Sequence, residues 1–353
     1  MDILQWIKHH LADRQVVALL LLLGFIVVVF LTVGRFLTPI IVSLVLAYLL
    51  EGLIQQLEKF KVPRFVAVNS VFIVFMLAFL FLLLGLAPKL YRQIGQLVQS
   101  LPRMVAAWQD RLLLLPEKYP EVFTEHQVNM IVDSISTQIG RLSQNILSVS
   151  MASVLGLIEV VVYIVLVPVV VYFFLKDKDK ILIYFYRFLP ENIDLAGRIW
   201  KDVNHKTARF IQGKIWETLI VWGVSYVAFF LLGLQYSILL SFLVGISVIV
   251  PYVGATVSTV IVLLVAFFQW GWGAHFAYIS IVLLFILVLD ANLLVPLLLS
   301  EIVNLHPLAI IIGILVFGGM WGIWGVFFAI PLATLINAII RAWPSAKQLE
   351  KSG

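Results

Sequence analysis

The chain has 353 residues, of which 62% are hydrophobic and 12% charged, and its formal net charge is +5. Soluble domains are about 45–50% apolar and about 25% charged, so this composition indicates a membrane protein and excludes an ordinary water-soluble fold. The basic residues gather beside apolar runs, where they set topology and meet anionic lipid, and nucleic-acid binding is therefore not expected. The chain contains no cysteine, which excludes disulfides and thiolate metal sites, and we expect neither a metal nor a cofactor.

Several apolar runs are long enough to cross a bilayer, which requires about 20 residues. The uninterrupted ones are Val16–Val33, Phe65–Leu86, Met151–Leu175 and Ile215–Leu234. Two more contain polar residues or proline, namely Phe36–Leu50 and Phe276–Leu298. The N-terminal run has no small-residue cleavage site and leads into further spans, so we interpret it as a first membrane span and not as a signal peptide.

Two later apolar stretches are interrupted by glycine and proline. The first, 236–268, is cut at Pro251–Gly254, and the second, 308–340, is cut at Gly318–Gly325. Each resulting piece has about 11 to 15 residues, or roughly 16 to 22 Å, which is too short for a perpendicular crossing. We therefore predict two broken or re-entrant hairpins. Such paired breaks indicate a substrate site in transporters, because broken helices present backbone carbonyls and dipoles to a ligand; close helix packing through glycine is the alternative.

The basic residues also predict the orientation of the chain, because short cytoplasmic flanks are enriched in Lys and Arg. They are densest between 176 and 214. We predict an all-α polytopic protein of a bacterial inner membrane, with about eight spans. Its expected parts are N-terminal transmembrane helices at 1–87, an external amphipathic helical hairpin at 88–147, a transmembrane helix at 148–175, cytoplasmic amphipathic helices at 176–214, a C-terminal transmembrane domain with the two broken hairpins at 215–343, and a cytoplasmic tail at 344–353.

The external segment carries a coiled-coil pattern. Apolar residues recur at alternating steps of four and three from Leu90 to Trp108, and again from Val128 to Val149. This is the period of 3.5 residues that brings helices together along a seam. We expect a helical hairpin that packs either on itself or against neighbouring subunits, and we predict a homo-oligomer.

Asp290 is the principal candidate for a functional side chain. An ionisable group at membrane depth costs about 2.5 kcal/mol or more to insert, so each one is a functional hypothesis. A structural carboxylate that pairs with a neighbouring helix is the alternative. The residues expected to line the transport pathway are Asp290, Asn292, Pro296, Pro251, Gly254, Gly318, Gly319 and Gly322.

Two other ionisable residues are candidates for a coupling role. Glu159 belongs to an overlong apolar run, so we expect it near the external interface. His306 could titrate near physiological pH, but its place directly before Pro307 favours a helix cap.

No catalytic motif is present. An intramembrane aspartyl protease needs two facing aspartates, and only Asp290 is predicted to lie deep. The nucleophile turn of serine proteases, the His-Glu-x-x-His motif and the phosphate-binding loop of NTPases are all missing from the sequence. We therefore expect a protein that is not an enzyme, and transport that is driven by a gradient or runs downhill.

Taken together, several segments resemble the autoinducer-2 exporter family of membrane transporters. They are Pro251–Ala255, Asp290–Pro296, Asn304–Leu308, Phe317–Gly322 and Ala329–Leu332, and the similarity extends to Leu46–Glu51 and Phe174–Lys178. The resemblance covers nearly the whole chain and implies a homo-oligomeric inner-membrane transporter.

The resemblance implies no particular substrate, because the family includes members assigned to sodium/proton antiport and many without an established cargo. Three functions stay open. The first is a secondary transporter or permease for a small solute, such as an exported signalling molecule. The second is a cation antiporter of the sodium/proton type with Asp290 as the titrating group. The third is a membrane scaffold that transports nothing.

Overall fold

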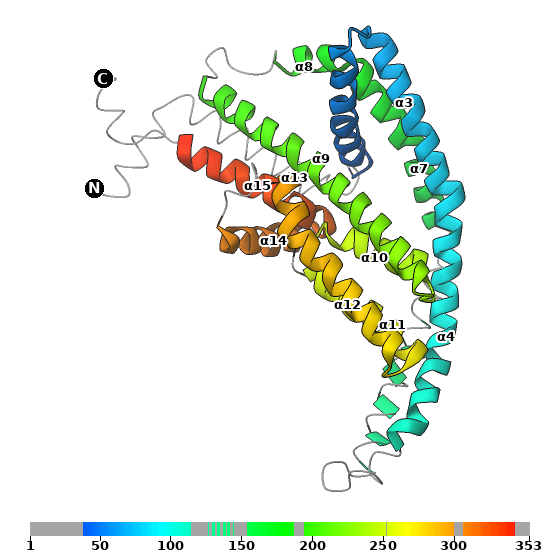
Figure 1. The fold of residues 1–353 in the computed structure, drawn as a ribbon. Coiled ribbons are helices and arrows are strands. Elements are labelled where there is room, and N and C mark those ends of the chain that lie inside the picture. Colours follow the sequence, from blue (N-terminus) through cyan, green and yellow to red (C-terminus); the bar gives the residue numbers. More distant parts are fainter. Residues whose placement is uncertain are drawn as a thin grey trace, which may run out of the picture. The chain divides into compact units, whose positions relative to one another are not determined.

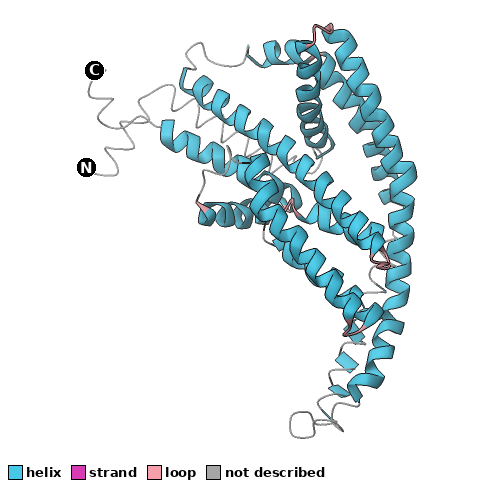
Figure 2. Ribbon diagram, in the orientation of Figure 1, coloured by secondary structure: helices cyan, strands magenta, loops and turns pink. Residues whose placement is uncertain are grey.

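The computed structural model describes residues 38–113, 154–186, 194–251, 253–299 and 306–342, together with isolated helical positions between 126 and 144. Figure 2 shows helices and connecting loops throughout these residues, with no strand among them. Five of the described helices are long and apolar enough to cross a membrane. They are Thr38–Lys59, Arg64–Met104, Lys206–Leu231, Val253–Trp270 and Ala274–Leu299. The predicted all-α polytopic membrane fold is confirmed. The first predicted span, Val16–Val33, lies outside the described residues.

Contacts divide the chain into two compact units. Unit 1 comprises Met1–Met76, Glu159–Gly213 and Leu299–Gly353, and unit 2 comprises Leu77–Ile158 and Lys214–Leu298. The four boundaries fall inside helices, namely α3 (Arg64–Phe81), α7 (Val154–Lys176), α9 (Asp194–Leu231) and α13 (Val295–Leu299), which Figure 1 labels. Each unit has its own apolar core.

Unit 1 contains the helix Thr38–Lys59, most of α3, the first part of α9, and all or most of four further helices. These are α7 (Val154–Lys176), α8 (Lys178–Tyr186), α14 (Pro307–Trp321) and α15 (Ile323–Ala342). The apolar core of unit 1 lies between the helix Thr38–Lys59, α3 and α7. It includes Leu50, Ile54, Val68, Val171 and Leu175. The Ser43 hydroxyl lies 3.2 Å from the Val167 carbonyl of α7 and 2.7 Å from the Pro39 carbonyl. Backbone carbonyls at membrane depth need such internal donors, because lipid offers none.

The predicted break at Gly318–Gly325 is confirmed and lies at Gly322, between α14 and α15. Gly322 has φ 62° and ψ −138°, a conformation that requires glycine. A Cβ at Gly325 would lie 1.8 Å from the Phe317 carbonyl, so the two helices meet backbone to backbone. The expected length of the pieces was wrong for α15, which has 20 residues and continues through Pro331.

Unit 2 contains the second part of α9 and the helices that follow it. These are α10 (Ser237–Ser247), α11 (Val253–Trp270), α12 (Ala274–Leu289), a π-helical turn η2 (Asp290–Leu294) and α13 (Val295–Leu299). The core includes Val221, Phe229, Leu240, Val262 and Leu283. The predicted break between α10 and α11 is confirmed. The expected short length was wrong for α11, because its 18 residues extend to Trp270.

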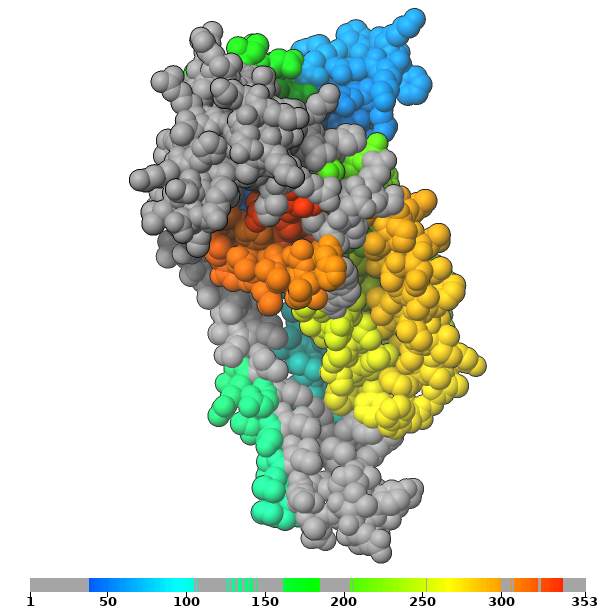
Figure 3. Space-filling model, turned by 90° about the vertical axis from the view of Figure 1, so that its left-hand side faces the viewer, coloured from blue at the N-terminus to red at the C-terminus, as the bar shows by residue number. Residues whose placement is uncertain are grey.

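The outer surface of α11 and α12 is apolar. The exposed large hydrophobic side chains of these two helices, which Figure 3 draws in yellow to amber, include Val257, Leu264, Ile281, Leu284 and Phe285. Apolar side chains exposed along helices of this length suit contact with lipid tails, and not with water.

The predicted external segment begins without a break in the helix. From α3 the chain continues through a second π-helical turn, η1 (Leu82–Leu86), directly into α4 (Ala87–Leu113). In unit 2, the Gln93 side chain of α4 accepts a hydrogen bond from the Leu239 N–H at 2.8 Å, and the Tyr236 hydroxyl donates to Ser100 at 3.0 Å. The first heptad stretch therefore packs, at least in part, on the chain's own α10. Most of the second stretch, from Val128 to Val149, lies outside the described residues.

Candidate functional site

Helix α9 carries a buried ion pair at the point where it enters unit 2. Lys214 and Glu217 lie one helical turn apart, and the lysine Nζ is 2.8 Å from Glu217 Oε1. Their side chains are only 5% and 1% exposed. Two charges removed from water in this way are tolerated only when they neutralise each other and their remaining polar atoms find partners.

The broken helix supplies a partner for the lysine. Lys214 Nζ donates a hydrogen bond of 2.9 Å to the carbonyl of Val248, the residue that ends α10. The last carbonyls of a helix have no intrahelical donor and form the negative end of the helix dipole, so they favour a cation. A carbonyl released by the predicted break therefore takes part in the ionic cluster.

Close packing behind the break requires Gly254. A Cβ at this position would lie 1.8 Å from the Ser247 carbonyl. The hydroxyls of Ser247 and Ser258 lie 3.0 Å apart, and both side chains are buried. The start of α11 is thus held directly against the end of α10.

Asp290 completes the cluster. It begins the π-helical turn η2, where the Val295 N–H reaches back five residues to the Asp290 carbonyl. Its carboxylate lies within electrostatic range of Lys214 and Glu217. Asp290 Oδ1 and Glu217 Oε2 are buried and find no hydrogen-bond partner among the residues that the structure describes. One cation faces two carboxylates, so the ionised cluster carries a net charge of −1.

A row of polar atoms continues the cluster along α9. Thr218 Oγ1, Trp222 Nε1 and Ser225 Oγ are buried without a hydrogen-bond partner in the described parts of the chain, as is Thr259 Oγ1 on α11. Steps of four, four and three from Lys214 place the three α9 residues on the helix face that holds Lys214. Buried polar groups are normally hydrogen-bonded, so such a row offers donors and acceptors to a ligand or to water.

Two predicted pathway residues next to Asp290 are exposed. The Asn292 side chain donates to the Val288 carbonyl at 2.9 Å, which gives it a local bond on its own helix. Pro296 lies in the short helix α13 that follows the π-helical turn. A role for either in a transport pathway stays a prediction.

The three predicted glycines at the other break belong to unit 1. Gly322 makes the turn, a Cβ at Gly318 would lie 2.8 Å from Val326 Cγ2, and a Cβ at Gly319 would meet nothing within 4 Å. Gly318 and Gly322 thus serve the packing of α14 on α15. Since Asp290 belongs to unit 2, a site shared by both breaks stays a prediction.

Of the two residues that are candidates for a coupling role, the structure describes the side chain of His306 but not that of Glu159. His306 caps α14, because its Nδ1 accepts a hydrogen bond of 3.2 Å from the Leu308 N–H. The favoured interpretation as a helix cap is confirmed, and a coupling role stays a prediction. Glu159 lies on α7, but its side chain is outside the described residues.

Sequence reasoning missed the ion pair. Lys214 was counted among the basic residues of the segment 176–214, whereas the structure shows that its side chain is buried. Glu217 was not singled out, although its side chain is buried as well. The expectation that only Asp290 lies deep in the membrane stays a prediction. A Lys and a Glu three residues apart at the edge of an apolar run are the signal that could have identified the pair.

A second ionic cluster lies in unit 1. The Arg64 guanidinium lies 3.2 Å from Glu51 and from Glu58 and also donates to the Leu175 carbonyl, while Lys178 lies 2.8 Å from Glu51. It joins the helix Thr38–Lys59, α3, α7 and α8, and it brings together the segments Leu46–Glu51 and Phe174–Lys178. The Glu51 side chain is nearly buried, so this cluster stabilises the packing of these helices in unit 1.

Comparison with known proteins gives consistent matches over almost the whole chain. A family model described as "AI-2E family transporter" matches residues 17–345. The chain is 41% identical over 347 residues to "Putative permease PerM" of Escherichia coli K12, covering 98% of each protein. It is 27% identical over 308 residues to "Putative transport protein YueF" of Bacillus subtilis, covering 85% of this chain and 82% of the relative.

Proposed function

Because this chain belongs to the AI-2E family of transporters, we propose that it is a secondary transporter or permease for a small solute in a bacterial inner membrane. The buried cluster of Lys214, Glu217 and Asp290 beside the α10–α11 break is the observation that carries this proposal. Broken helices with charged groups near the middle of the membrane are the usual substrate sites of secondary transporters.

The cluster has the chemistry to hold a polar solute. Lys214 is held in place by Glu217 and the Val248 carbonyl, whereas Asp290 Oδ1 and Glu217 Oε2 are left to accept hydrogen bonds. The polar row on α9 extends this chemistry to Ser225, about 12 Å beyond Glu217 at 1.5 Å per residue. The cargo would then be a small molecule with several hydrogen-bonding groups. The family name points to an exported signalling molecule as one candidate.

The test begins with a cargo screen and ends with flux. A specific cargo raises the unfolding temperature of the purified protein by mass action, so a thermal-shift screen of small polar metabolites identifies it. Flux of that cargo into proteoliposomes is then measured for the wild type and Asp290→Asn. The variant keeps the size and hydrogen bonding of the side chain but loses its charge, and we expect it to lose most flux.

Glu159→Gln is the control, and we expect it to transport like the wild type. Wild-type flux by Asp290→Asn, with unchanged pH dependence, would show that the carboxylate is structural. If no screened compound binds and no flux is found, a scaffold that transports nothing is the better account.

A cation antiporter is the second candidate, and the net charge of −1 in the cluster favours it. A buried cluster with one carboxylate in excess suits the binding of a proton or a monovalent cation. Proteoliposomes that contain a pH-sensitive dye measure this activity directly when a sodium gradient is imposed. A luminal pH change in wild-type vesicles that is missing with Asp290→Asn supports antiport; the same pH change in protein-free vesicles contradicts it.

The expected topology and assembly belong to the same proposal. Both termini and 176–214 are cytoplasmic, 88–147 is external, and the protein forms a homo-oligomer. Since the chain has no cysteine, a single cysteine introduced at Gln127 reports the topology. An impermeant reagent should label it in intact cells, and labelling only after lysis would overturn the orientation. A purely monomeric protein in both detergent and lipid would overturn the assembly.

A further inference from the structure

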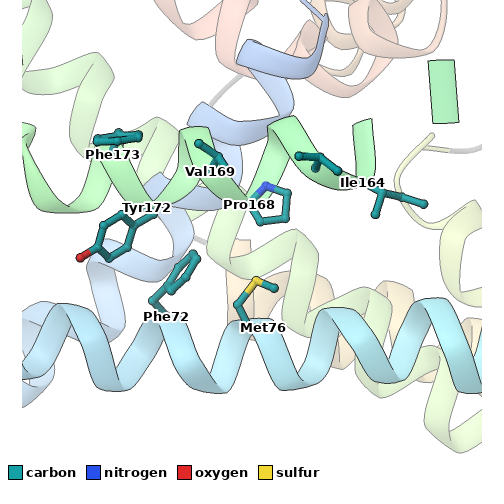
Figure 4. A pocket seen from close by; sticks show the side chains of 8 residues that line it. Phe72, Met76, Ile164, Pro168, Val169, Tyr172 and Phe173 are labelled. Carbon is teal, nitrogen blue, oxygen red and sulfur yellow. The ribbon is translucent and has the colours of Figure 1, made fainter. Parts of the chain in front are cut away.

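An open apolar groove runs between α3 and α7 in unit 1. It has a volume of about 450 Å³ and is lined by Phe72 and Met76 of α3 and by Ile164, Pro168, Val169 and Tyr172 of α7, among others. Figure 4 shows Phe72 and Met76 of α3 and Pro168 and Tyr172 of α7 in the space between the two helices. Tyr172 contributes the lining's hydroxyl group, which donates to Asn69 Oδ1 at 3.4 Å.

A hydrocarbon chain matches this lining. Both helices belong to apolar segments, and the groove is open along its side, so in a bilayer it faces lipid tails. Apolar surface without contact atoms loses its dispersion energy, and a flexible acyl chain restores those contacts.

A cation marks one end of the groove. The Lys176 ammonium lies 5.6 Å from the centroid of the Tyr172 ring, so the charge sits next to a residue of the lining. The neighbouring Lys178 pairs with Glu51, and Lys180 pairs with Asp177. Within the described residues Lys176 forms no ion pair, and its side chain is exposed.

The groove and the cation together form a site for one kind of molecule. We propose that the groove binds an acyl chain of an anionic phospholipid, whose phosphate group lies at Lys176. Basic residues that border a space between membrane helices are the usual recognition sites for anionic head groups. A lysine at the end of a membrane helix also extends naturally toward the head-group region. A zwitterionic lipid would fill the groove equally well but would gain less from Lys176.

The role of the Lys176 charge is tested by lipid competition on the full-length protein. The protein is equilibrated with vesicles of equal parts phosphatidylcholine and phosphatidylglycerol, and the retained lipids are counted by native mass spectrometry. We expect phosphatidylglycerol to be preferred. Lys176→Gln should lower this preference about fivefold, which corresponds to ~1 kcal/mol for one lysine near an anionic surface. The control Lys180→Gln removes an exposed charge from the next helix, α8, and should leave the preference unchanged.

The groove is tested by filling it. Val165 lines the groove and is 59% exposed, whereas Val161 lies one turn away on α7, outside the lining, and is 56% exposed. We expect Val165→Phe to retain less of both lipids and Val161→Phe to behave like the wild type. Both variants should elute as the wild type does in size-exclusion chromatography.

Three results would overturn the proposal. The first is an undiminished phosphatidylglycerol preference in Lys176→Gln. The second is wild-type lipid retention in Val165→Phe. The third is efficient disulfide crosslinking between two copies of the chain through a cysteine at position 165, which would show that a second copy covers the groove.

Discussion

Replacing Lys214 with methionine should destabilise the protein strongly. The Lys214 and Glu217 side chains are 5% and 1% exposed, and their charged atoms are 2.8 Å apart. Removing the lysine leaves the Glu217 carboxylate buried without its cation, and breaking such a pair from one side costs about 3–5 kcal/mol. The Val248 carbonyl loses its donor as well, which moves the expected loss of unfolding free energy toward the upper end of this range.

A double-mutant cycle separates the pair from its surroundings. Lys214→Met, Glu217→Gln and the double variant are unfolded in the same detergent, and the free energy of unfolding is compared with that of the wild type. Because the double variant leaves no unpaired charge in the pair, it should be more stable than Lys214→Met alone. The coupling energy between the two positions should then exceed ~1 kcal/mol.

The chain contains a matched control for this measurement. Lys180 pairs with Asp177 at the same spacing of three residues, but these side chains are 84% and 25% exposed. An exposed pair contributes about 0–1 kcal/mol, so Lys180→Met should be nearly neutral. The reasoning is refuted if Lys214→Met costs no more than Lys180→Met, or if the losses of the two single variants simply add in the double variant.

The two helix breaks give further predictions, each measured as the melting temperature of the purified protein. Gly254→Ala should largely prevent folding of unit 2, because its Cβ would lie 1.8 Å from the Ser247 carbonyl; Gly223→Ala, with nothing within 4 Å, should be neutral or stabilising by about 0.5–1 kcal/mol. Gly322→Ala should cost about 1–3 kcal/mol, because φ is 62° there. Gly319→Ala, in open space, is its control, and equal melting temperatures for the two variants would contradict the assignment of strain to Gly322.

Much of the fold could be predicted because its signals are local. A run of apolar residues indicates a span whatever it packs against, and glycine and proline act on their own backbone. Both breaks were therefore found from the sequence, one beside Pro251 and one at Gly322. The lengths of α11 and α15 were less predictable. Residues such as Gln269, whose side chain bonds the Gly233 carbonyl at 2.9 Å, can extend an apolar helix when a neighbouring segment supplies a partner.

The candidate site was only partly predictable because its parts are joined through tertiary contacts. Asp290 stood out as a lone carboxylate in a long apolar run. Lys214 did not, since a lysine at the edge of such a run is normally a cytoplasmic flank residue. What distinguishes it is a hydrogen bond to Val248, far away in the sequence, and no local pattern reports that contact.

The π-helical turn at Asp290 affects how relatives of this protein are aligned. A turn closed by a bond over five residues holds one residue more than an α-helix needs at the same place. A relative without the turn would therefore show a gap of one residue within 290–294. Each residue of an α-helix advances by about 100° around the axis. Aligned residues after the turn therefore point in the same direction only if the alignment keeps the gap. Closing it to raise the apparent identity would match Pro296 and Leu297 with residues that point in another direction.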